Sequence, residues 1–458
     1  MSQYPPAAPH LPHLAETDEA ATRWRWVAIG VFVLSASLNY LDRQLLAAAA
    51  PSVMSEFRLN NVSYGLLLSA FSLTYLFVVP FAGLLIDRVG LHASTMIAVG
   101  AWSLVSAGTG LTSTFRGLLT CRMGLGIAEA AGIPSSSKAT AMYLKPKELG
   151  LGIAVQAIGV SIGMISAPLV VAAVVPRFGW RAAFVVCGMV GLAWVPLWRF
   201  TSRRIPARAN DSSAPAMAVR ELMRDRRLWG ILAANTLIMA VHSMWMNWTT
   251  VYLVQVHRLT PTEANRYFAW IPPIFATLGG LVGASLVLRS AGRGQTPFAA
   301  RLRMCTLVAP FLLVTAVVPL MGSPALAAAA ISASFFACMM MLSNLHAIPI
   351  DLFGVGRSAY TAGLLACSYA LMQMVLSPAM GAIADAYGFR VLCVIVSVLP
   401  LIASFILRVT LAGDASRRIP PERQPATSGD FAPLPTASFG HAGQRLSSQR
   451  SDATSHTS

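Results

Sequence analysis

The chain has 458 residues, of which 55% are hydrophobic and only 11% are charged. Soluble globular proteins carry about 25% charged residues, so this composition excludes an ordinary soluble domain and indicates a polytopic membrane protein. The net charge of +16 does not indicate nucleic-acid binding, because the basic residues lie between apolar segments instead of forming one stripe.

Uncharged runs predict an all-α integral membrane protein with twelve transmembrane helices, each long enough for the roughly 20 apolar residues that a crossing needs. Residues 1–23, which precede them, show no signal-peptide pattern and are expected to form a cytoplasmic tail. The predicted helices span 24–54, 61–86, 93–112, 117–142, 149–176, 181–199, 228–256, 265–288, 303–321, 325–349, 358–385 and 390–408.

One long polar break, residues 200–227, separates six helices from six. It predicts a cytoplasmic linker between an N-terminal bundle (24–199) and a C-terminal bundle (228–410), which is followed by a disordered cytoplasmic tail (411–458). The linker side carries more Lys and Arg in its loops than the opposite side, so the positive-inside rule places both termini in the cytoplasm.

The two bundles share a short sequence pattern. Pro168 is followed eleven residues later by Gly179-Trp180-Arg181, and Pro378 is followed ten residues later by Gly388-Phe389-Arg390. Repeats of six helices are typical of transporters, whose substrate site lies near the midplane where the repeats meet.

Few ionisable residues lie inside the predicted spans, and four of them are expected at one depth. Asp42 and Arg43 belong to the first helix, and Arg122 and Glu129 belong to the fourth. A rise of about 1.5 Å per residue places all four between the outer half and the middle of the membrane. Arg122 and Glu129 are two turns apart and therefore share a helix face.

These four residues have two interpretations. A buried ion-pair network could serve only to fix helix packing, although such pairs often contribute little net stability. Alternatively, the arginines bind a carboxylate with their planar guanidinium groups, and the acids exchange protons. Intramembrane charges are costly and usually functional, which favours the second interpretation.

Other polar residues have a structural explanation beside a functional one. The lone histidines His242 and His346 are expected to be hydrogen-bonded core residues, and Lys138 is expected to extend toward the membrane surface. The six cysteines form neither a Cys-x-x-Cys pair nor a Cys/His cluster, so we expect neither a disulfide framework nor a metal site.

Three blocks of sequence resemble the major facilitator superfamily, and within it the anion:cation symporters of sugar acids. The first runs from Asn39 to Gln44, the second is the G-x-x-x-D-R-x-G loop from Gly83 to Gly90, and the third is the run from Arg122 to Ala130. The resemblance covers roughly residues 24–410 and is stronger in the N-terminal half.

The resemblance implies proton-driven uptake of a small carboxylate, such as a hexuronate, aldonate or aldarate, by alternating access. It implies a monomer in the inner membrane that uses the proton gradient and no cofactor. The implied site consists of the following residues: Arg43 and Arg122 on the substrate carboxylate, Asp42 and Glu129 as proton carriers, Tyr40 and Tyr75 lining the cavity, and Gly83, Asp87, Arg88 and Gly90 in the gating loop.

The sequence also departs from the family pattern. Leu91-His92, Leu149 and Ala284 replace polar or charged residues of the family's cytoplasmic gate. The eleventh helix lacks an Asn that many members direct at substrate hydroxyls. Ser368, Tyr369 and Gln373 are the polar groups available there, and we expect Gln373 to bind the substrate. A carboxylate is therefore a firmer expectation than a typical sugar acid.

Three alternatives stay open at this point. A proton-coupled efflux antiporter of organic compounds, or uptake of aromatic carboxylates, would use the same fold. A transport-derived sensor would bind without flux. A membrane-embedded enzyme would need a metal cluster or a nucleophile constellation, and no spacing of that kind is present.

Overall fold

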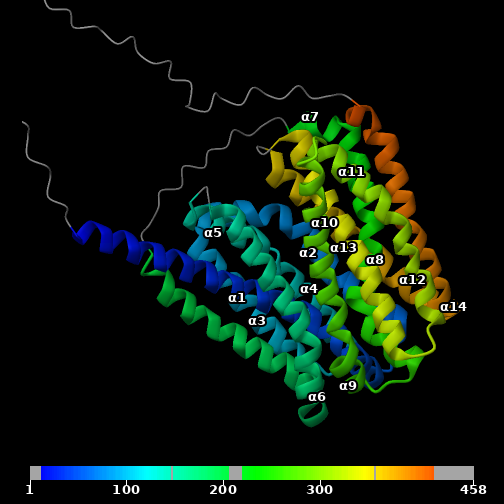
Figure 1. The fold of residues 1–458 in the computed structure, drawn as a ribbon. Coiled ribbons are helices and arrows are strands. Elements are labelled where there is room, and N and C mark those ends of the chain that lie inside the picture. The colour runs from blue at the N-terminus through cyan, green and yellow to red at the C-terminus, as the bar shows by residue number, and fades with distance from the viewer. Residues whose placement is uncertain (1–11, 146–147, 206–218, 355–356, 417–458) are drawn as a thin grey trace, which may run out of the picture. The chain divides into compact units, whose positions relative to one another are not determined.

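The computed structural model describes residues 12–145, 148–205, 219–354 and 357–416, and every regular element in these ranges is a helix (Figure 1). Residues 1–11 of the predicted tail 1–23, residues 206–218 of the predicted linker 200–227, and residues 417–458 of the predicted tail 411–458 lie outside the described residues. The N-terminal half comprises α1 (Pro12–Phe57), α2 (Asn61–Val89), α3 (Leu91–Thr109), α4 (Phe115–Glu129), α5 (Gly132–Tyr143) and α6 (Leu149–Ser202).

The C-terminal half follows the short α7 (Val219–Arg224). It comprises α8 (Arg226–His257), α9 (Pro261–Glu263), the π-helix η2 (Ala264–Ala269), α10 (Ile271–Ala291), α11 (Pro297–Val308), the 3-10 turn η3 (Ala309–Leu313), α12 (Val314–Val317), the 3-10 turn η4 (Val318–Leu320), α13 (Pro324–Phe353) and α14 (Ser358–Ser416).

Nine helical stretches of the described chain are long and apolar enough to cross a membrane. Two of them, α6 and α14, reverse at a glycine and provide two passes each, and α4 with α5 provides one more. Gly179 and Gly388 both have a φ of 76°, a conformation that glycine adopts without steric cost. The predicted twelve-helix fold is therefore confirmed, and the repeated Gly-aromatic-Arg pattern marks the same turn in each half.

Several helix boundaries differ from the prediction. The first helix begins at Pro12, inside the predicted tail 1–23, and α14 continues to Ser416, inside the predicted tail 411–458. Two further differences have a local cause. The predicted helix 117–142 is interrupted between α4 and α5, because Pro134 has no N–H to bond the carbonyl of Ala130. The predicted helix 303–321 begins earlier, at Pro297, where the Thr296 side chain accepts a hydrogen bond from the amide of Ala299. Arg301, expected in a loop, therefore lies in α11 and pairs with Asp351 at 2.9 Å.

Within each half the helices pack lengthwise, α1 along α6 and α10 along α13. Between the halves, glycines allow close contact of α2 with α14: a Cβ on Gly65 would overlap the backbone of Ser377, and one on Gly381 would overlap Asn61. The Tyr64 hydroxyl donates to the Asn247 carbonyl at 2.7 Å. We call the end of the molecule that carries residues 58–60, Gly179 and Gly388 the sealed end, and the opposite end the open end.

A carboxylate of the C-terminal half caps the start of α2 at the sealed end. Asp385 accepts hydrogen bonds from the backbone amides of Asn61 at 3.2 Å and Val62 at 3.1 Å, and from the Asn61 side chain at 2.7 Å. Gln255 of α8 exchanges further side-chain hydrogen bonds with Asn61. The first amides of a helix have no partner within it and favour negative charge, so this contact joins the halves strongly.

Removing this cap should shift the molecule toward a state open at the sealed end. In Asp385→Ala, spin labels at the exposed Leu111 and Tyr387 should show a longer distance population by pulsed electron resonance. Glu263→Gln serves as a control, because Glu263 bonds only to Thr260 at the start of its own helix. An unchanged distance distribution in Asp385→Ala would mean that the cap does not hold the halves together.

Close packing also brings α4 against α2 beside the charged residues. A Cβ on Gly126 would overlap the carbonyl of Phe71 and the hydroxyl of Thr74, whereas one on Gly124 would meet only the Val105 side chain at 3.5 Å. Gly126→Ala should therefore destabilise the protein by about 1–3 kcal/mol, the usual cost of overpacking. Gly124→Ala should leave the melting temperature within about 1–2 °C of wild type, and equal melting temperatures for both variants would contradict the packing.

Candidate functional site

The first and fourth passes meet through a buried ion pair. Arg43 of α1 donates from Nη2 to Oε2 of Glu129 at 2.8 Å and from Nε to the same oxygen at 3.1 Å. The Glu129 side chain has no exposed surface, and that of Arg43 is 15% exposed. The prediction that the two helices bring these charges to one level is therefore correct for Arg43 and Glu129, which form a direct ion pair.

Three aromatic rings surround the Arg43 guanidinium. Its Cζ lies 5.2 Å from the ring centroid of Tyr40, 4.8 Å from that of Phe71 and 5.4 Å from that of Tyr75. Cations are attracted to the faces of such rings, more strongly when water is excluded. Tyr40 and Tyr75, predicted to line the cavity, thus hold the guanidinium in place, and Phe71 is an addition that the sequence did not reveal.

Asp42 points away from its neighbour Arg43. Its carboxylate accepts a hydrogen bond from Ser106 of α3 at 2.6 Å, and the residue is 1% exposed. Arg122 is 3% exposed, lies 5.8 Å from the ring centroid of Phe184 and is within electrostatic range of both Asp42 and Glu129. The two acids and two arginines therefore form one buried cluster.

The cluster has unused hydrogen-bonding capacity. Asp42 Oδ2, Arg122 Nη2 and Glu129 Oε1 are buried, and none has a hydrogen-bond partner among the residues described. Buried polar atoms in native proteins nearly always have partners, and exceptions commonly mark a functional group or a place for water or a ligand. The arrangement can therefore accept a proton at either acid and an anionic oxygen at Arg122.

The C-terminal half approaches this cluster through α14. Tyr369 is within electrostatic range of Arg43, Tyr40 and Tyr75. Gln373, the predicted contributor, is buried one turn further along α14 and makes no hydrogen bond within the described ranges. Tyr369 thus joins the residues near the paired arginine, and Gln373 stays a predicted contributor to the cavity.

A second polar group lies in the C-terminal half. His346 Nε2 is 2.9 Å from Asn235 Oδ1, and the Asn235 amide donates to Ser368 at 2.7 Å. The expectation of a hydrogen-bonded histidine is correct for His346. Nδ1 of His242 has no partner among the described residues, and its ring packs edge-on against Phe335 and Tyr369.

The predicted gating loop is anchored within its own half. Asp87 pairs with Lys138 of α5 at 2.6 Å, which gives both residues a partner. Gly90 has a φ of 88° between α2 and α3, and Arg88 is exposed. A Cβ on Gly83 would meet nothing within 4 Å, so no other helix of the described chain packs closely against this glycine.

Sequence reasoning missed Ser106 and Phe71, which contact Asp42 and Arg43. Both residue types are common in membrane helices, and only the packing of α2 and α3 against α1 gives them a role. No group of three or more His, Cys, Asp or Glu side chains in the described part of the chain is placed to hold a metal ion.

The arrangement agrees with the results of sequence comparison. The sequence profile of the Major Facilitator Superfamily matches residues 32–354. The chain belongs to the major facilitator superfamily. It is therefore a multi-pass membrane transporter and not an enzyme.

Similar transporters have names that refer to sugar acids. The chain is 28% identical over 429 residues to the hexuronate transporter of Escherichia coli K12, a match that covers 89% of this chain and 98% of that protein. It is 29% identical over 278 residues to the galacturonate transporter of Dickeya chrysanthemi, covering 57% of this chain and 80% of that protein. Both belong to the sugar-acid group of the superfamily.

A solved structure has the same fold. The inward-facing, unoccupied bacterial homologue of the human lysosomal transporter Spinster has a TM-score of 0.73 and 19% identity, and the match covers 86% of this chain and 97% of that one. At this identity the likeness supports the transporter fold alone.

Proposed function

We propose that this transporter couples inward proton flow to the uptake of a small organic anion, a sugar acid such as a hexuronate, aldonate or aldarate. The similar transporters of hexuronate, galacturonate and L-galactonate support the substrate class. The protein would act as a monomer in the inner membrane and need no cofactor beyond the proton gradient.

The ion pair between Arg43 and Glu129 carries the proposal. While Glu129 is ionised, its carboxylate accepts the hydrogen bonds of the Arg43 guanidinium. A substrate carboxylate would need the same hydrogen-bond donors. A proton on Glu129 removes its charge, so the guanidinium becomes available for a substrate carboxylate. Proton and anion then favour each other's binding, which is the thermodynamic requirement for symport.

Asp42 and Arg122 complete the coupling. Asp42 has one carboxylate oxygen on Ser106 and one without a partner in the described chain, so it can take a second proton. Arg122, with an unpartnered Nη2, offers a second contact for the anion. Binding of both ligands must favour one conformation over the other if it is to drive the transport cycle.

The distribution of basic residues supports placing the open end in the cytoplasm, with both termini on that side. Among the described residues, the hydrogen bonds that Asn61, Tyr64, Asn265 and Thr277 make between the halves lie at the sealed end or near mid-height. With this orientation the structure is an inward-facing state. The two bundles would then be the moving parts of alternating access.

Reconstituted vesicles test this function. An inward proton gradient should drive accumulation of D-galacturonate above its external concentration, and an uncoupler should abolish the accumulation. Export that requires an opposing proton gradient would instead support the antiporter alternative. Folded, reconstituted protein that moves no organic anion in either direction would refute the proposal.

A further inference from the structure

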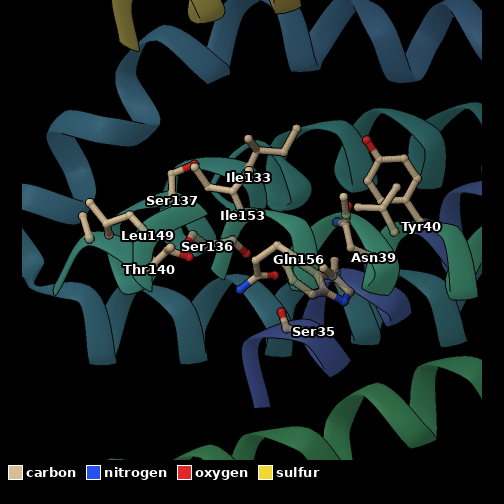
Figure 2. Close-up of a pocket in the computed structure, with 16 residues that line it drawn as sticks. Ser35, Asn39, Tyr40, Ile133, Ser136, Ser137, Thr140, Leu149, Ile153 and Gln156 are labelled. Carbon is tan, nitrogen blue, oxygen red and sulfur yellow. Dashed lines mark hydrogen bonds between the residues drawn. The ribbon is translucent and has the colours of Figure 1, made fainter. Parts of the chain in front are cut away.

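A pocket lies beside Tyr40, on the side toward the open end, between α1, α5 and the first part of α6 (Figure 2). Its volume is about 340 Å³, within the range typical of small-molecule sites. Tyr40 belongs to both features: its ring contacts Arg43 and also lines the pocket. A ligand bound to Arg43 can therefore extend into this space.

Unsatisfied polar atoms surround the pocket. Asn39 Nδ2, Trp102 Nε1 and both amide atoms of Gln156 are buried without a hydrogen-bond partner among the described residues. Asn39 is only 4% exposed and Trp102 only 1% exposed. Leaving such groups unpaired costs about 1–3 kcal/mol each, so a ligand that supplies the missing partners would be favoured.

The rest of the lining is uncharged. None of the sixteen lining residues is Asp, Glu, Lys, Arg or His. Ile133 and Ile153, drawn in Figure 2, add an apolar wall and are 46% and 65% exposed. A pocket with a few buried hydrogen-bonding groups and an apolar wall fits a ring with hydroxyls on its edge and C–H groups on its face. It does not fit a second carboxylate, whose burial without a cation is costly.

The spacing links the pocket to the carboxylate site. Asn39 precedes Arg43 by one turn, so the two side chains share a face of α1 and lie about 6 Å apart along its axis. Gly132 follows Glu129 by three residues, and a Cβ there would lie 3.5 Å from Asn39 Nδ2. The absence of a side chain at Gly132 therefore keeps the pocket open beside Asn39.

We propose that this pocket binds the uncharged, hydroxyl-bearing body of the anion, so that the transporter selects a sugar monocarboxylate over a dicarboxylate. Asn39 and Trp102 would donate to ring oxygens, and Gln156 would accept from a hydroxyl. The inference rests on the proposed function, because it requires the carboxylate to bind Arg43.

Equilibrium binding to the purified full-length chain tests the inference with three probes. D-galacturonate has one carboxylate on a sugar ring, D-galactarate has a carboxylate at each end, and glycolate has a carboxylate and almost no body. D-galacturonate should bind at least about tenfold more tightly than D-galactarate. Asn39→Leu and Gly132→Leu should each weaken D-galacturonate binding by about tenfold or more and leave glycolate binding unchanged.

Gly108→Leu is the matched control, because a Cβ at Gly108 meets nothing within 4 Å and the residue does not line the pocket. If Gly132→Leu fails to fold, Gly132→Ala and Gln156→Leu test the same prediction. Equal binding of D-galacturonate and D-galactarate, with no effect of the pocket variants, would overturn the inference and leave the proposed function intact. Failure of wild type to bind any of the three anions would refute both.

Discussion

The Glu129→Gln variant should lose proton-driven accumulation of substrate and keep substrate exchange. Glutamine has nearly the shape of a protonated glutamate, so it leaves Arg43 without a charged partner at every pH. Substrate should therefore bind without a proton, and the proton gradient can no longer drive its accumulation. Accumulation in vesicles under an inward proton gradient should fall to the level set by passive equilibration, while counterflow between preloaded and external substrate continues.

Two comparisons make this result specific. Glu148→Gln should accumulate substrate like wild type, because among the described residues the Glu148 side chain bonds only the nearby amide of Lys145. The affinity of Glu129→Gln should lose most of its dependence on pH, since competition between the carboxylates for Arg43 has been removed. Accumulation by Glu129→Gln at the wild-type level would exclude Glu129 as the proton carrier.

Arg43→Lys should lose substrate binding although it keeps the positive charge. The guanidinium is planar, and its Cζ lies within 5.4 Å of the centroids of three rings, Tyr40, Phe71 and Tyr75. An ammonium group cannot stack in this way or offer two parallel donors to a carboxylate. Loss of charged hydrogen bonds should cost about 1.5–3 kcal/mol, which corresponds to about 10- to 150-fold weaker binding by isothermal calorimetry.

Stability must be measured alongside binding, because Arg43 also neutralises Glu129. In the double variant Arg43→Lys/Glu129→Gln, residue 129 carries no charge that a guanidinium must neutralise. Its melting temperature should therefore return from the lowered value of Arg43→Lys toward that of wild type. Binding should stay weak in the double variant. Recovery of binding together with stability would show that Arg43 supports Glu129 and does not contact the substrate.

The charged cluster could be predicted from sequence because the free-energy cost of placing charged side chains inside the membrane restricts where they can lie. Charges inside a membrane helix must face a polar interior, and helical spacing places Asp42, Arg43, Arg122 and Glu129 at one level. Which acid pairs with which arginine depends on side-chain direction, and no sequence pattern indicates that Asp42 faces Ser106. The repeated glycine turns were readable for a similar reason, since few residues other than glycine adopt their backbone conformation.

The pocket between α1, α5 and α6 could not be predicted in the same way. Asn39, Gln156 and Trp102 are widely separated in sequence, and each would be unremarkable in a core where its polar atoms found partners. Only the packed structure shows that these atoms stay unpaired and lie around one space. Likewise, the proximity of Tyr369 to Arg43 depends on the rotation of α14, which its nearly uniform apolar sequence does not determine.

The acidic residues at the open end constrain how that end closes. Five of them are engaged within their own half or connecting segment: Asp87 with Lys138, Glu148 with the Lys145 amide, Glu221 with Arg357, Asp225 with Arg227 and Asp351 with Arg301. Ion pairs between the halves at these five residues would first have to break these contacts. Closure that leaves the five contacts in place relies on burial of apolar surface, so its equilibrium should respond to temperature and very little to ionic strength.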